Sequence, residues 1–289
     1  MKLLVYPDTN CWRGELASLS ELRSLKNHGG CRIACSYTVA KECATAETIG
    51  LSRAALGRIL DLSDTWLRGR DDILKGIVGY VNNGCYDEIS VEMLPYAARQ
   101  ESRFWHTQYQ SLSDEHLPQR IFKEAFQRER VLDAQVATSE FLAAAGGSGP
   151  MSDEDVARWL FRCLDPSDPK WGGILLNEAL GQRGLPVDRI HEVLRRLNQF
   201  PGLKLSHGHF IYRILQYIRG CRVDKSVRQD SLILLPMSSS CCFVTVDRHI
   251  HQTAKVLGVN DLVLTPTQAI TRLKSGCRTD TPLPLVPLA

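Results

Sequence analysis

The chain has 289 residues and a mass of 32.4 kDa; 44% of its residues are hydrophobic and 23% are charged. This ordinary composition excludes collagen-like, coiled-coil-only and wholly disordered chains. The 35 Lys and Arg residues nearly balance the 32 Asp and Glu residues, so the net charge of +3 says little about partners.

No stretch approaches the roughly 18 consecutive apolar residues of a membrane-spanning helix, so we expect no membrane partner. The first eight residues carry one Lys and no adequate apolar region, which is not the pattern of a secretory signal. The ten cysteines are scattered, without a Cys-x-x-Cys pair or zinc spacing. They fit small buried side chains in a reducing compartment, and we expect a cytoplasmic protein.

The N-terminal part alternates short strands with helices. The apolar run at 2–6 predicts a buried strand, and leucines at helical spacing over 16–25 predict a helix. A second strand is expected at 31–35 and a second helix at 38–48. Strand–helix–strand–helix is typical of a parallel sheet.

Between about 50 and 220 the pattern is helical, with no convincing strand alternation. Ser152 and Asp155 resemble a capping box with Asp in place of Glu, and Gly-Gly-Ser-Gly-Pro at 146–150 is the clearest flexible break. The expected helices are 52–68, 71–82, 87–112, 117–144, 153–164, 172–183, 187–199 and 208–219.

The C-terminal part resumes the alternation. A helix at 226–235, a strand at 242–246, a helix at 249–257, a strand at 262–264 and a helix from Pro266 are expected. The predicted organisation is a discontinuous α/β domain (1–49 and 221–275), an all-helical insertion (50–220) and a Pro-rich tail (276–289).

Four carboxylates occupy special positions in this pattern. Asp8 and Asp247 follow predicted strands, Glu42 lies in the helix after the second strand, and Asp230 lies in the helix before the 242–246 strand. Ligands of an open parallel sheet gather outside the carboxyl ends of its strands, so we expect these acids to converge. Each acid alone also fits an ordinary role as a helix cap, a solvated residue or an ion-pair partner.

Converging carboxylates repel one another unless a cation lies between them. Oxygen ligands suit Mg²⁺ or Mn²⁺ rather than zinc. Such an ion lowers the pKa of a bound water and stabilises charge on a phosphodiester under attack. The acidic set therefore predicts metal-dependent hydrolysis.

Five segments in a fixed order carry a resemblance to a known family. They are Val5-Tyr6-Pro7-Asp8-Thr9-Asn10, Tyr37-Thr38-Val39-Ala40-Lys41-Glu42, Gln229-Asp230-Ser231-Leu232-Ile233, Phe243-Val244-Thr245-Val246-Asp247 and Leu264-Thr265-Pro266-Thr267-Gln268-Ala269. They resemble, in turn, the opening strand and acid, the second-helix acid, the third and fourth acidic motifs and the closing strand–helix of PIN-domain nucleases.

The resemblance implies a PIN-like α/β/α sandwich with a parallel sheet of about four or five strands, carrying an inserted helical subdomain. It implies a metal-dependent nuclease in which Asp8, Glu42, Asp230 and Asp247 are catalytic and hold one or two Mg²⁺ or Mn²⁺ ions. RNA is favoured as substrate because most single-domain relatives act on RNA. A structure-selective DNA nuclease, a non-catalytic scaffold and a toxin-type nuclease held by a partner stay open as alternatives.

Residues beside the acids are candidates for supporting roles. Asn10 and Thr245 would orient a carboxylate or a water. Four basic residues would contact phosphate groups, or else only balance the acidic charge. They are Lys41, Lys225, Arg228 and Arg248.

The histidines and the helical insertion receive weaker assignments. His207, His209, His249 and His251 show no third ligand, and we expect surface or capping roles. The insertion leaves and re-enters the α/β part near the acids, so it is expected to select a substrate or to dock a protein inhibitor or regulator. The oligomeric state is left open.

Overall fold

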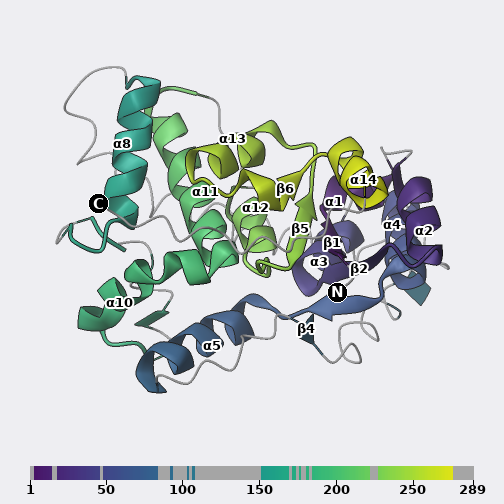
Figure 1. Ribbon diagram of the computed structural model, residues 1–289, viewed down its shortest axis with the longest axis horizontal. Helices are drawn as coiled ribbons and strands as arrows, with labels where there is room; N and C mark the ends of the chain where they lie inside the picture. The colour runs from purple at the N-terminus through teal and green to yellow at the C-terminus, as the bar shows by residue number, and fades with distance from the viewer. Residues whose placement is uncertain are drawn as a thin grey trace.

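The computed structural model is drawn in Figure 1. It describes residues 3–14, 18–45, 48–83, 92–93, 103, 106–107, 151–168, 171–173, 176, 180–181, 184–221 and 227–275. The expected helix at 117–144, the break at 146–150 and the tail at 276–289 lie outside these ranges. Among the described helices, none is long and apolar enough to cross a membrane.

A six-stranded sheet in the order β4-β3-β2-β1-β5-β6 forms the centre of the fold. Its strands are β1 (Leu3–Pro7), β2 (Cys31–Ser36), β3 (Thr65–Leu67), β4 (Glu92–Met93), β5 (Cys241–Val244) and β6 (Val263–Leu264). Five of them run parallel, and β4 pairs antiparallel with β3. The predicted α/β class with a parallel sheet is confirmed.

Helices pack around this sheet (Figure 1). They are α1 (Thr9–Arg13), α2 (Ser18–Asn27), α3 (Tyr37–Ala44), α4 (Ile49–Leu62), α5 (Arg70–Asn83), α8 (Asp153–Leu164), α10 (Ile190–Arg195), α11 (Pro201–Ile218), α12 (Val227–Leu234), α13 (Arg248–Val256) and α14 (Pro266–Lys274), with 3₁₀ turns at Val187–Arg189, Leu197–Gln199 and Asn260–Leu262. Local sequence sets several starts. Ser36 caps α3, and the predicted capping box of Ser152 and Asp155 opens α8.

The expectation that residues 50–220 are all helical is wrong at β3 and β4. The helix expected at 52–68 ends at Leu62, and Thr65–Leu67 pairs with β2 in the register Ala34 to Thr65. Three buried residues in a row give no alternation, so a strand this short looks like one more helical turn. The sheet therefore extends past residue 49.

Helix α11 begins seven residues earlier than the expected 208–219, at Pro201. Proline suits the first helical turn. A Cβ on Gly202 would lie 2.2 Å from the carbonyl oxygen of Leu235, and one on Gly208 would lie 2.5 Å from Leu257 Cδ1. These glycines, which look like helix breakers in the sequence, let α11 approach the segments after α12 and α13 closely.

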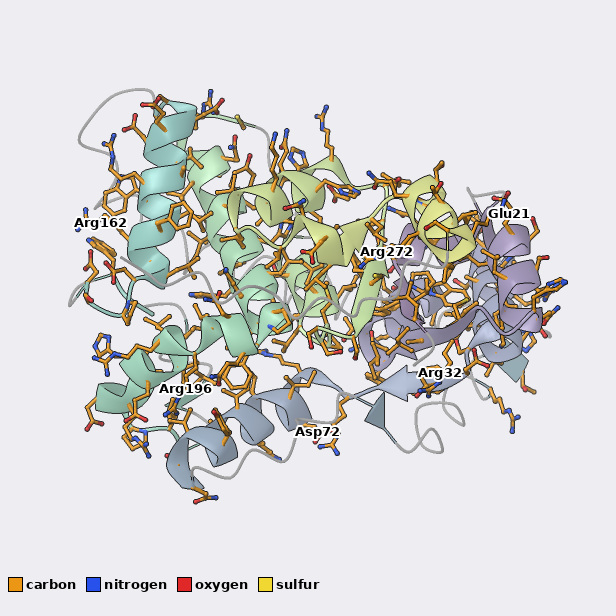
Figure 2. The ribbon with its side chains drawn as sticks, viewed as in Figure 1. Glu21, Arg32, Asp72, Arg162, Arg196 and Arg272 are labelled. Atoms are coloured by element: carbon orange, nitrogen blue, oxygen red, sulfur yellow. The ribbon has the colours of Figure 1, made fainter. Side chains whose placement is uncertain are left out.

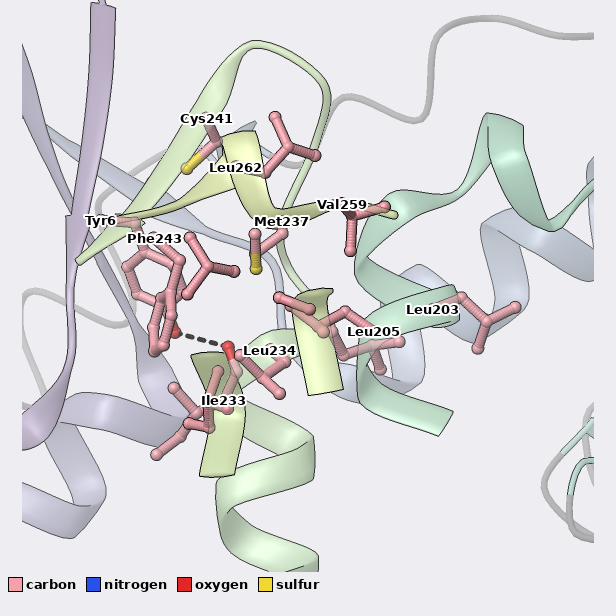
Figure 3. Packing of buried hydrophobic residues seen from close by; sticks show 14 of the residues in the cluster. Tyr6, Leu203, Leu205, Ile233, Leu234, Met237, Cys241, Phe243, Val259 and Leu262 are labelled. Atoms are coloured by element: carbon pink, nitrogen blue, oxygen red, sulfur yellow. Dashed lines mark hydrogen bonds between the residues drawn. The ribbon is translucent and has the colours of Figure 1, made fainter. Parts of the chain in front are cut away.

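One large hydrophobic cluster joins α11 to the sheet (Figure 3). The rings of Tyr6 and Phe243 have centroids 5.2 Å apart, and Leu203 and Leu205 of α11 belong to the same cluster. Burial of such side chains stabilises the fold by about 1.5–3 kcal/mol each. The described part of the predicted insertion thus shares its core with the α/β part.

Polar and ring contacts organise the outer helices. Arg189 Nη2 donates to the Val81 carbonyl at 2.7 Å, which ties the start of α10 to α5. Arg162 of α8 lies 4.9 Å from the centroid of the Trp159 ring. Figure 2 shows Glu21 of α2 and Arg162 of α8 at the outside of the molecule.

Candidate active site

The strand order reverses between β1 and β5. β1 lies between β2 and β5, and β5 is followed by β6 on the far side. Ligands of open α/β sheets bind at such a switch point, outside the carboxyl ends of the strands. Pro7 pairs with Val244, so these two strand ends are level, and Asp8 N donates to the Val244 carbonyl at 2.8 Å.

Asp8 directly follows β1 and caps α1. Its Oδ1 accepts a hydrogen bond from Thr9 N at 2.6 Å, and its Oδ2 accepts one from Thr245 Oγ1 at 2.8 Å. The residue is only 7% exposed. Both carboxylate oxygens are therefore fixed in a nearly closed environment.

Thr245 links Asp8 to Asp247. Its fully buried hydroxyl donates to Asp8 and accepts from Asp247 N at 3.0 Å. Asp247 Oδ1 in turn caps α13 by accepting from His249 N at 2.7 Å. The carbonyl of Thr245 accepts from His251 Nε2 at 3.0 Å. The side chain and the backbone carbonyl of Thr245 therefore both fix the position of the segment after β5.

Glu42 approaches from α3. Its Oε2 accepts from Thr9 Oγ1 at 2.9 Å, and its backbone carbonyl accepts from Arg13 Nη2 at 2.9 Å. Thr9 therefore contacts both Asp8 and Glu42, a role that the sequence analysis did not assign. Its only signal in the sequence is its place next to Asp8.

The three carboxylates influence one another. The pKa of Asp8 is raised to about 7, first by burial and then by repulsion from Glu42 and, more weakly, Asp247, although the hydrogen bonds from Thr245 and Thr9 act to lower it. Within the described residues no ion pair involves Asp8, Glu42 or Asp247. None of the three carboxylates is therefore neutralised by direct pairing with a Lys or Arg of the described residues.

Asp230 lies half-buried in the first turn of α12. Three residues on, the Ile233 carbonyl accepts from the Tyr6 hydroxyl at 3.0 Å (Figure 3), and the same hydroxyl lies 2.6 Å from Ser36 Oγ. Because its proton goes to Ile233, the Tyr6 oxygen accepts from Ser36. The bond to Ile233 anchors the C-terminal end of α12, three residues after Asp230, to β1.

The structure gives less information on the other residues that the sequence predicts for the site. Asn10 is half-buried in α1, and within the described structure its side chain makes no hydrogen bond. Lys41 is half-buried on α3, and Arg248 is exposed at the start of α13. Lys225 and the side chain of Arg228 lie outside the described part of the chain.

The expectation of surface or capping histidines is wrong for His207 and His209, which are buried in α11. Burial lowers the pKa of both to about 3. His209 Nδ1 lies 3.1 Å from Thr253 Oγ1, whose hydroxyl donates to the His249 carbonyl at 2.9 Å. Nδ1 of His209 is therefore the protonated nitrogen. In the sequence, the burial of these histidines was indicated only by the repeated polar residues within an apolar helix.

No group of three or more His, Cys, Asp or Glu side chains in the described ranges is arranged to hold a metal ion. Comparison of the chain with family models, with curated proteins and with solved structures finds no match. The PIN-domain resemblance and the metal site stay predictions from the sequence.

Proposed function

We propose that the chain is a metal-dependent nuclease with a PIN-like α/β/α fold, which hydrolyses phosphodiester bonds with an activated water. The observation that supports this proposal is the repulsion that Glu42 and Asp247 exert on the buried Asp8 at the switch point of the sheet, where no ion pair joins any of the three to a described Lys or Arg. A divalent cation would relieve their repulsion. Its binding would draw the three carboxylates together.

The donor chemistry fits Mg²⁺ or Mn²⁺. Each carboxylate oxygen has two lone pairs, so Asp8 keeps one on each oxygen after accepting from Thr9 and Thr245. Oxygen-only ligands match hard cations and not zinc. We assign Asp8, Glu42 and Asp247 as ligands, and Asp230 as the fourth by the family resemblance.

A bound Mg²⁺ or Mn²⁺ would lower the pKa of a water and stabilise charge on the phosphoryl group. The residues of the chain prepare that chemistry. Thr245 and Thr9 fix the orientation of the Asp8 carboxylate, and Thr9 also holds Glu42. Lys41 and Arg248 are candidates for contacts to neighbouring phosphates. RNA is the proposed substrate by the family resemblance, and the 50–220 region is the proposed surface for an inhibitor or regulator.

Metal binding is tested by melting the protein in EDTA and in millimolar Mn²⁺. An ion that binds only the folded state raises the melting temperature by mass action. Asp8→Asn should lose most of this shift, whereas Glu154→Gln, which alters an exposed acid on α8, should keep it. An equal shift in both variants would remove Asp8 from the ligand set.

Activity is tested with labelled single-stranded RNA, single-stranded DNA and a DNA flap, each with Mg²⁺ and with EDTA. RNA cleavage that EDTA abolishes, and that Asp8→Asn and Asp247→Asn reduce by roughly 10²-fold or more, supports the proposal. Cleavage confined to the flap would reassign the substrate. Metal binding without cleavage of any substrate would favour the scaffold alternative.

A further inference from the structure

A buried guanidinium lies on α11, in the region predicted as an insertion. Arg213 is only 4% exposed, and among the described residues it has neither an ion pair nor a hydrogen-bond acceptor. Buried charges are normally paired, because removing a charge from water without an acceptor is costly. The described protein supplies no acceptor, and the guanidinium nitrogens are not sealed from solvent, so the acceptor is water or an anion that enters from solvent.

The packing of α11 on α13 fixes where this side chain lies. His209 contacts Thr253, and Tyr212 Oη donates to Gln252 Oε1 at 3.4 Å. Further back along α11, Gly208 lies against Leu257. Later residues of α11 thus meet earlier residues of α13, and the two helices run antiparallel.

Continuing this register places Arg213 at the first turn of α13, which Asp247 caps. The electrostatics agree with the register. After burial, the positive charge of Arg213 is the next cause that lowers the pKa of His249, and Asp247 acts on the same ring in the opposite direction. Arg213 and Asp247 therefore flank one imidazole, although no ion pair joins them.

Burial lowers the pKa of His209 to about 3, so this buried ring does not supply the positive charge near Asp247. Arg248 is exposed to solvent. The buried positive charge beside Asp247 is the guanidinium of Arg213.

We propose that Arg213 binds a phosphate group of the nucleic-acid backbone next to the phosphodiester that is cleaved. A guanidinium offers a planar set of donors that matches two phosphate oxygens at once. A helix from the 50–220 region thereby completes the site on the sheet. This inference rests on the proposed function, which supplies the phosphodiester.

Binding of single-stranded RNA, measured by fluorescence anisotropy in EDTA over a salt series, tests the subsite without catalysis. Arg213→Gln should weaken binding roughly tenfold and reduce the slope of log K against log salt by about 0.7, the value for one phosphate contact on a single strand. Arg219→Gln removes a charge from the same helix, where it pairs with Asp153 at the surface, and should change neither. Equal effects of the two substitutions would overturn the subsite.

A second arm separates this proposal from the nuclease proposal. Inorganic phosphate in EDTA should raise the melting temperature of the native protein and of Arg219→Gln, but not that of Arg213→Gln, at matched ionic strength. If that pattern appears without RNA binding, the anion site stands and the nucleic-acid function fails. If phosphate acts equally on all three proteins or on none, the anion site is overturned.

A third measurement excludes a structural role. Arg213→Met keeps most of the buried stem of the side chain and removes a charge that has no partner in the described protein, so its melting temperature without phosphate should equal or exceed that of the native protein. A clearly lower melting temperature, or failure to fold, would show that the guanidinium has an acceptor inside the protein and would overturn the proposal.

Discussion

Asp8 and Asp155 both accept hydrogen bonds at the start of a helix, yet the pKa values of their carboxyls move in opposite directions. On α8, the exposed Asp155 accepts from the Ser152 hydroxyl and backbone, and these bonds lower its pKa. On α1, Asp8 accepts bonds of similar length, but burial and Glu42 raise its pKa to about 7. Local capping geometry is therefore secondary to burial and nearby charge in setting the protonation state.

The largest expected effect comes from removing the buried charge. At pH 8 and without metal, Asp8→Asn should raise the free energy of unfolding by up to about 4 kcal/mol, because the native carboxylate is ionised where its charge is disfavoured. Asp155→Asn should lower the free energy of unfolding, since it removes a favourable charge–hydrogen-bond interaction. Urea unfolding in EDTA measures both. If both substitutions lowered the free energy of unfolding, the opposite pKa shifts of Asp8 and Asp155 would be contradicted.

The pH dependence of stability sharpens the same contrast. The folded pKa of Asp8, about 7, exceeds the ordinary value of 3.8, so its contribution to stability falls as pH rises from about 4 to about 7 and is constant above. His207 and His209 have folded pKa values near 3, below the ordinary value of 6.5, so their contribution to stability rises with pH up to about 6.5.

Both proteins contain the two histidines, so the histidine contribution cancels in the difference between the free energies of unfolding of Asp8→Asn and of the native protein. That difference, from urea unfolding in EDTA at several pH values, should grow between about pH 4 and pH 7 and then level off. For Asp155, whose folded pKa is lowered, the difference should change only at lower pH, with stability lost as pH falls below its ordinary value. If the difference in unfolding free energy between Asp8→Asn and the native protein did not change with pH, the pKa of Asp8 would not be raised in the folded state.

A smaller effect is expected at the hydroxyl that joins β1 to the flanking helices. Tyr6→Phe leaves the Ile233 carbonyl and Ser36 hydroxyl without their partner, which should cost about 1–3 kcal/mol of unfolding free energy and weaken the Mn²⁺-dependent rise in melting temperature. Tyr80→Phe is the control, because its hydroxyl contacts Gln199 at the surface. If Tyr6→Phe and Tyr80→Phe lowered the free energy of unfolding equally, the buried hydrogen bonds of Tyr6 would make no extra contribution to stability.

The smallest effect belongs to the exposed helix start. Ser152→Ala removes the cap of α8 and should lower the free energy of unfolding by about 1 kcal/mol. Neither the Mn²⁺-dependent shift in melting temperature nor RNA cleavage should change. A changed metal response would mean that α8 and the acidic edge are coupled.

The sequence predicted those parts that depend on short segments. The helix at 153–164 is correct, and a capping box marks its start. The buried apolar run before Asp8 forms β1, but the strand expected at 242–246 ends at Val244, because Val246 is exposed. The strand at Thr65–Leu67 was missed because three buried residues have no periodicity.

The rest depends on packing between distant segments. Thr9 contacts Glu42 only because α1 meets α3, and α11 lies close to the end of α13 because Gly208 packs against Leu257. Such partners are separated by tens of residues, so spacing rules that apply within one helix or strand cannot find them.

The central place of β1 has a consequence for folding on the ribosome. One edge of β1 pairs with β2, which follows soon in synthesis, but the other edge waits for β5, near the end of the chain. Until residues 241–244 emerge, β1 presents a row of unpaired backbone groups to solvent, a template for pairing with other chains. Contacts between such distant segments form slowly. A nascent chain therefore keeps one edge of β1 exposed until residues 241–244 have emerged.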